Sequence, residues 1–124
     1  MQRVTSRCAG LDVHQASVVA CAEVPNRDGE LIAHQATFGT TTPDLLALRD
    51  WLVGLGVREV AMEAGGVYWK PVYHVLEDAF ARVLVVNAHH VKQVPGRKTD
   101  ASDAAWLCQL LGHGLLRGGF VPPE

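Results

Sequence analysis

Four acidic residues stand at positions where they could hold divalent metal ions together. Asp12 lies near the end of an apolar segment, in Gly-Leu-Asp-Val, and Glu63 ends another, in Val-Ala-Met-Glu. Asp100 and Asp103 are three residues apart, so both would project from one face of a helical turn. Carboxylates that gather closely cannot all stay ionised without a cation. Because oxygen ligands suit Mg²⁺ or Mn²⁺, the four residues predict a site, with two such ions, for phosphodiester cleavage or transfer.

Each of these carboxylates also has an ordinary structural explanation. Asp12 could cap the turn that follows at His14, and Glu63 could be an exposed residue at a strand-to-loop junction. Asp100 could be a helix N-cap with Asp103 in the first turn, which is a common way for a helix to begin. The metal interpretation therefore depends on whether residues from three distant segments converge.

A basic stretch precedes the acidic pair. Residues 89–98, HHVKQVPGRK, carry Lys92, Arg97 and Lys98 and contain no acid. This stretch could neutralise the phosphates of a nucleic acid in the site, or it could be a solvated loop. Its two histidines have no third His or Cys at zinc spacing. The bulk charge does not favour nucleic-acid binding, because the net charge is −2 and the pI is about 6.3.

Five apolar segments are predicted to be strands that position these residues. Residues 7–13, 18–24 and 31–38 are joined by short turns and should form an antiparallel meander. Residues 59–62 and 82–87 are short buried strands separated by helical segments. Right-handed crossovers would place these last two strands parallel to the first.

Three helices are predicted after the meander. The first opens at Thr42-Pro43, an N-cap followed by proline, and stops at Gly56. The second covers residues 68–80, and the third starts near Thr99-Asp100. The resulting order predicts an α/β domain of three layers, in which a mixed five-stranded sheet of order 3-2-1-4-5 has helices on both faces. This is the RNase H-like layout.

In this layout Asp12 and Glu63 would lie side by side at the carboxyl edge of the sheet, where open α/β sheets bind ligands. The aromatic residue Trp69 is predicted to be a core or interface residue, with stacking on a nucleic-acid base, alongside Tyr68, as the alternative.

Length and composition fit one folded domain. The chain has 124 residues, of which 48% are hydrophobic, which disfavours disorder. It has no apolar run long enough to span a membrane and no signal-peptide pattern, so a cytoplasmic protein without a membrane partner is expected. Cys8, Cys21 and Cys108 are far apart and form no CxxC pair, so we interpret them as reduced core thiols.

Three stretches of the chain resemble the DEDD transposases of bacterial insertion sequences. They are GLDVH, VAMEAGGVYWKPVYHVLE and LVVNAHHVKQVPGRKTDASDAAWLCQLLGHGLLRGGFVPPE. The resemblance covers residues 10–124, and the run at 94–103 is its most specific part. The N-terminal domain of that family is similar to Holliday-junction resolvases. The resemblance implies an RNase H-like, RuvC-like domain in which the acidic tetrad maps onto four catalytic, metal-binding residues: Asp12, Glu63, Asp100 and Asp103.

The resemblance also implies an activity and partners. The family recombines DNA by Mg²⁺-dependent chemistry, and its members resemble recombinases guided by a bridge RNA and are expected to form homo-oligomers. Family proteins continue into a second domain that carries a serine implicated in strand exchange. Residues 1–118 are therefore expected to be the catalytic domain, and residues 119–124 the start of a linker. On charge, four residues are predicted to contact nucleic acid: Lys70, Lys92, Arg97 and Lys98.

Two alternatives to a metal-dependent recombinase remain. The chain could be a non-catalytic fragment that binds nucleic acid or a partner, and metal-dependent cleavage of branched DNA would distinguish the two. It could also be half of an actin-like or sugar-kinase fold, which likewise begins with an acidic first strand. That class needs a glycine-rich phosphate loop after the first strand, which residues 14–17, His-Gln-Ala-Ser, do not provide.

Overall fold

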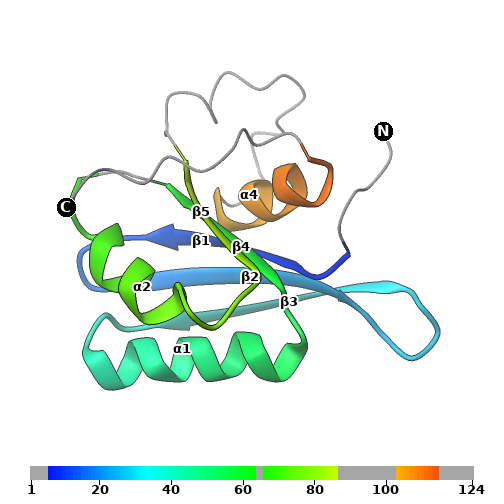
Figure 1. The fold of residues 1–124 in the computed structure, drawn as a ribbon, viewed down its shortest axis with the longest axis horizontal. Helices are drawn as coiled ribbons and strands as arrows, with labels where there is room; N and C mark the ends of the chain where they lie inside the picture. Colours follow the sequence, from blue (N-terminus) through cyan, green and yellow to red (C-terminus); the bar gives the residue numbers. More distant parts are fainter. Residues whose placement is uncertain (1–5, 64–65, 87–102, 115–124) are drawn as a thin grey trace.

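A computed structural model describes residues 6–63, 66–86 and 103–114 of the chain. A mixed sheet of five strands lies between helices on its two faces (Figure 1). The strands are β1 (Cys8–Val13), β2 (Val18–Pro25), β3 (Leu31–Phe38), β4 (Glu59–Glu63) and β5 (Arg82–Val86). The helices within the described ranges are α1 (Thr42–Leu55), α2 (Trp69–Leu76) and α4 (Asp103–Gly112).

The strand order is β3-β2-β1-β4-β5, which confirms the predicted order. β1 pairs antiparallel with β2 and parallel with β4, and β5 continues the parallel part of the sheet. The parallel register places Leu11 beside Met62 and Met62 beside Val85. The carboxyl ends of β1, β4 and β5 therefore meet at one edge of the sheet.

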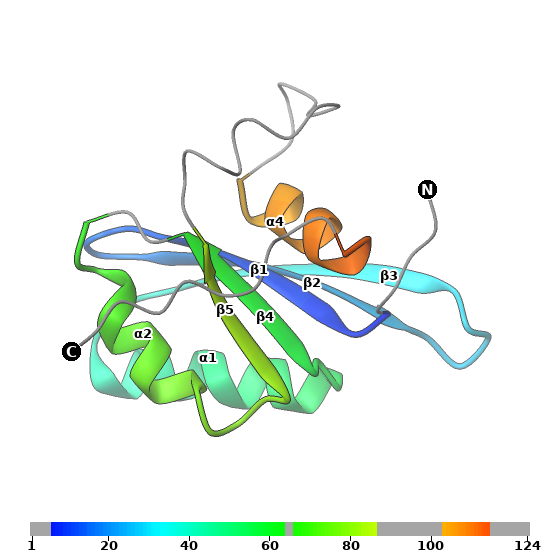
Figure 2. The same cartoon turned by 45° about the horizontal axis from the view of Figure 1, so that its top comes forward.

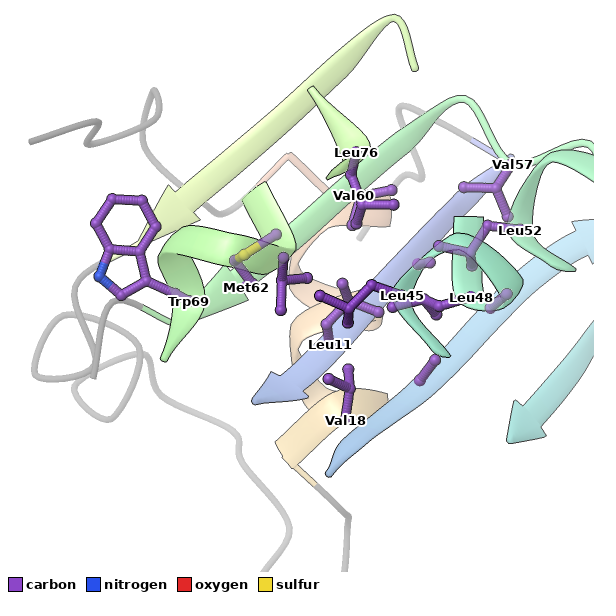
Figure 3. Close-up of a cluster of buried hydrophobic side chains, with 14 of the residues drawn as sticks. Leu11, Val18, Leu45, Leu48, Leu52, Val57, Val60, Met62, Trp69 and Leu76 are labelled. Atoms are coloured by element: carbon purple, nitrogen blue, oxygen red, sulfur yellow. The ribbon is translucent and has the colours of Figure 1, made fainter. Parts of the chain in front are cut away.

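One face of the sheet is covered by α1 and α2, and it holds the larger hydrophobic core (Figure 2). Alternate strand residues point to this face, so Ala9 and Leu11 of β1 lie in the core while Gly10 points away. Figure 3 shows this core, in which strand side chains meet those of the two helices. Its fully buried aliphatic members include Leu11, Val18, Leu48, Leu52, Val60, Met62 and Leu76.

The opposite face is covered by α4, which lies mainly over β1 (Figures 1 and 2). The buried residues of β1 and β4 beneath it are small, namely Cys8 and Ala61, and β5 adds Leu84 and Val86. The helix contributes the larger side chains, including Trp106, Leu107 and Leu110. The helix therefore carries most of the apolar volume of this second layer.

The first helix begins one residue earlier than predicted. The N-cap is Thr41, not Thr42, because the Thr41 hydroxyl accepts a hydrogen bond from the backbone N–H of Asp44 at 3.3 Å. Thr41 has extended backbone angles, as an N-cap requires, whereas Thr42 is already helical. The predicted stop at Gly56 is confirmed: Gly56 has a φ of 86° and closes the helix with N–H bonds to the carbonyls of Leu52 and Val53.

The second helix is shorter than predicted, since it ends at Leu76 rather than at residue 80. Nothing in the sequence from 77 to 80 breaks a helix, but the chain must turn there to enter β5. The Ala81 N–H bonds to the Arg58 carbonyl at 2.9 Å, which ties the chain to the start of β4. Tertiary pairing thus overrides helix propensity. The predicted start of the third helix, at residues 99–100, lies outside the described residues.

None of the helices within the described ranges has the length and apolar character that crossing a membrane requires.

Candidate active site

Asp12 and Glu63 lie at the same edge and on the same face of the sheet. Leu11 of β1 is paired with Met62 of β4, so Asp12 and Glu63 are the next residues along these parallel strands. Ala61 contacts the α4 layer, and side chains alternate along a strand, so Glu63 points to the α4 face. Gly10 meets α4 as well, which places Asp12 on that face by the same alternation. The predicted juxtaposition of the strand ends is therefore confirmed.

Asp103 is brought to this edge by the direction of α4. Cys8, at the start of β1, meets Cys108, whereas Gly10, two residues further along β1, lies beneath Ala104 and Leu107. The helix therefore runs opposite to β1, and its first residue, Asp103, is at the end that faces the carboxyl edge (Figure 1). Asp12 follows Gly10 by two residues and Asp103 precedes Ala104 by one. Three of the four predicted carboxylates thus lie toward one edge on one face.

Asp12 contacts His14, a residue that the sequence predicted only as part of a turn. The His14 Nε2 atom lies 3.1 Å from the Asp12 Oδ2 atom, and the Asp12 side chain is only 22% exposed. The turn itself is closed by backbone, since the His14 N–H bonds to the Ser17 carbonyl at 2.8 Å. Asp12 therefore contacts the ring of His14 rather than capping the backbone. The i, i+2 spacing of Asp12 and His14 at a strand end was the available signal.

The predicted nucleic-acid contacts are only partly within the described residues. Lys70 is exposed in the first turn of α2, the helix that follows β4 and Glu63. Its neighbour Trp69 is 5% exposed and belongs to the core, so the core prediction is confirmed and stacking on a base is not available to it. Tyr68 remains 44% exposed. The other predicted residues lie outside the described ranges: Lys92, Arg97, Lys98 and the acidic Asp100.

The donor chemistry at this edge fits the metal that the sequence predicts. Asp12, Glu63 and Asp103 offer carboxylate oxygens, which are the ligands that Mg²⁺ prefers. Within residues 6–63, 66–86 and 103–114, however, no group of three or more His, Cys, Asp or Glu side chains could by itself hold an ion. The described residues therefore provide donors of the right type from three segments without forming an assembled cage.

The three cysteines lie together between α4 and the sheet, which their spacing in the sequence did not indicate. All three are buried and free, which confirms them as core thiols. The sulfur atoms of Cys8 and Cys108 are 3.8 Å apart, and the Cys108 sulfur lies 3.6 Å from the Glu23 Oε1 atom. A hydrogen bond between Cys21 and Cys108 lowers the pKa of Cys21 and raises that of Cys108. The hydrogen-bonded thiols are thus a buried feature of this layer that is distinct from the carboxylates.

Comparisons with known proteins identify the family and the fold of this chain. A family model for DEDD transposases of the IS110 type, described as a transposase, matches residues 9–124. A structure of Thermus thermophilus RuvC is similar with a TM-score of 0.52 and 18% identity, over 93% of this chain and 84% of that one. The same organism's RuvC in complex with a Holliday junction substrate gives 0.54 and 12%, over 88% and 97%. The fold is therefore the RuvC-like form of the RNase H fold. A search of curated proteins gives no significant match.

Proposed function

This chain belongs to the DEDD transposase family of the IS110 type, and from that premise we propose that it is the catalytic domain for metal-dependent DNA strand cleavage and transfer. Membership of this family removes the actin-like and sugar-kinase alternative. One observation carries the proposal: Asp12, Glu63 and Asp103 come from three distant segments to one edge and one face of the sheet.

The proposed roles follow from that placement. Asp12, Glu63 and Asp103, with Asp100, would hold two Mg²⁺ or Mn²⁺ ions. Such ions, when bound, polarise a phosphodiester and stabilise charge on the attacking and leaving oxygens. His14 restrains the Asp12 carboxylate by its contact at 3.1 Å, so that this ligand is held before an ion arrives.

DNA is the substrate that we propose. One of the similar structures is of RuvC with a Holliday junction substrate, so branched DNA is the natural first probe for this fold. Exposed Lys70, at the start of α2, would contact the backbone phosphates, together with Lys92, Arg97 and Lys98. A guide RNA, assembly into homo-oligomers and a cytoplasmic location are further parts of the proposal that come from the sequence and its resemblance alone.

The metal site is tested by comparing the proposed ligands, at the carboxyl edge, with a carboxylate at the other end of β1. Binding of Mn²⁺ is measured by calorimetry for the wild type, Asp12→Asn and Asp103→Asn. Glu23→Gln is the matched control, because Glu23 pairs with Cys8 at the far end of β1 and contacts Cys108. Changes outside the direct ligands of a metal already cost about 10–100-fold in affinity. Loss of a direct ligand should therefore weaken binding at least ~100-fold, whereas Glu23→Gln should bind as the wild type does.

A cleavage assay on branched DNA then separates catalysis from binding. If the wild type cleaves branched DNA in a metal-dependent reaction and Asp12→Asn does not, the chain is a catalytic domain. A folded wild type that binds DNA and Mn²⁺ without cleaving would support the non-catalytic binding fragment instead. A folded wild type that binds no metal would refute the metal site.

A further inference from the structure

Gly10 lies at the point where α4 touches the sheet. A Cβ atom at this position would overlap the carbonyl oxygen of Ala104, and would lie 2.6 Å from the backbone nitrogen of Cys108 and 2.8 Å from the Cβ of Leu107. Real Cβ atoms do not approach other heavy atoms this closely. The helix backbone therefore rests directly on the backbone of β1, and only glycine leaves room for it.

The crowding cannot be relieved by a side-chain movement. Two of the three atoms that a Cβ would meet belong to the backbone of α4. Gly10 is not among the described glycines with positive φ, so alanine is compatible with its backbone conformation. Replacing Gly10 by alanine would therefore act through space alone, and the first turns of α4 would have to move away from β1.

This contact sets the distance between two of the proposed metal ligands. Asp12 follows Gly10 by two residues on the same face of β1, and Asp103 directly precedes Ala104 on α4. Ala104 is itself fully buried, so a small residue lies on each side of the contact. We propose that Gly10 is a positioning residue that, through its contact with Ala104, holds the Asp103 end of α4 at the height above β1 that metal binding requires.

The displacement would be local, because the larger core does not depend on α4. The cluster on the other face is built from the sheet, α1 and α2, and it contains no α4 residue. A larger side chain between β1 and α4 should thus leave this cluster folded while it moves Asp103 away from Asp12. Metal ligands must be held to within about half an ångström, so even a small shift of the helix matters.

The test rests on the proposed metal site and uses three variants of the whole chain. Gly10→Ala inserts a larger side chain from the strand, and Ala104→Leu inserts one from the helix with a residue that still favours helix. Leu110→Ala is the matched control: it removes buried packing two turns further along α4 and adds nothing under the first turn. Mn²⁺ affinity is measured by calorimetry and thermal unfolding by circular dichroism for each variant.

Gly10→Ala and Ala104→Leu should both remain folded and bind Mn²⁺ roughly 10–100-fold more weakly, as expected when supporting residues misplace a ligand. Leu110→Ala should lower the melting temperature by a similar amount or more while its Mn²⁺ affinity stays within about twofold of wild type. Wild-type affinity in folded Gly10→Ala, or an equal loss of affinity in Leu110→Ala, would overturn the positioning role. Unfolding of both Gly10→Ala and Ala104→Leu would also overturn it, because the contact would then support the whole fold. Absence of Mn²⁺ binding by the wild type would instead refute the proposed function.

Discussion

The two faces of the sheet are built on different principles. Toward α1 and α2 the strands present branched and long aliphatic side chains, such as Leu11, Val60 and Met62, which interdigitate with the helices. Toward α4 the same strands present Gly10, Ala61 and carboxylates, and the helix rests nearly on the backbone. The first face provides most of the buried apolar volume. On the second face small side chains let the helix approach the strand closely, which suits the proposed metal site.

If the two faces have separate roles, the largest change in stability is expected from Leu48→Ala in α1. Leu48 is fully buried in the larger cluster, so removing its side chain should cost about 2–5 kcal/mol of unfolding free energy. Because Leu48 belongs to the cluster on the face opposite α4, the Mn²⁺ affinity of the folded variant should be unchanged. Urea unfolding and calorimetry at a temperature where the variant is folded provide the two measurements. A loss of affinity in the folded variant would break the distinction between the faces.

A second, smaller effect should come from the thiols under α4 at alkaline pH. The hydrogen bond to Cys21 and burial raise the pKa of Cys108 above its ordinary value of 9.0, so the folded state keeps a proton that the unfolded state loses. The contribution of Cys108 to stability is therefore fully present below pH 9.0 and is lost above it, by about 1.4 kcal/mol for each pH unit. The pKa of Cys21 is lowered, so the stability that its thiolate adds grows as the pH rises toward 9.0 and is constant above that pH.

Cys108→Ala checks this pH dependence. The difference in unfolding free energy between the wild type and this variant should shrink between about pH 9 and 10, as the wild type loses stability through Cys108. Parallel stability curves across that range would show that Cys108 ionises equally in both states.

The smallest of the three effects should come from Thr41→Ala. The Thr41 hydroxyl caps α1 through the Asp44 N–H and donates to the Asp44 carboxylate at 2.7 Å. Loss of such a cap typically costs about 1 kcal/mol. Thr42→Ala is the control, since Thr42 is the first helical residue and should change stability by less. If Thr42→Ala were the more damaging of the two, the N-cap would lie where the sequence placed it.

Much of the fold was predictable because hydrophobic periodicity is local. The alternation along β1 and β2 and the short turns between them indicate a meander, and the helical spacing in α1 indicates the crossover. The two boundary errors have different causes. Three consecutive threonines offer equivalent N-caps before α1, and only backbone geometry selects Thr41. The end of α2 is decided by the bond between Ala81 and Arg58, a pairing that no local pattern encodes.

The sequence was sufficient to predict which strand ends meet at the site. It was not sufficient to predict the contacts that surround them. Parallel pairing of β1 and β4 brings Asp12 and Glu63 together, as the element order predicted. The contacts of Asp12 with His14 and of Gly10 with Ala104 were missed, because they depend on how closely α4 and the turn approach β1. Cys8, Gly10 and Asp12 do share one face of β1, and this run of small and polar residues was the signal that a close partner lies there.

The contact between Cys8 and Cys108 joins residues that are 100 positions apart, and it has a consequence for the order of events during synthesis. A growing chain emerges with its N-terminus first. Once β5 has emerged, the sheet can close its larger core with α1 and α2, and Asp12 and Glu63 already stand at the edge. Asp103 is still absent at that stage, because α4 is the last described element to be made. The edge that carries these three carboxylates is therefore completed only after the sheet and the larger core that support it have formed.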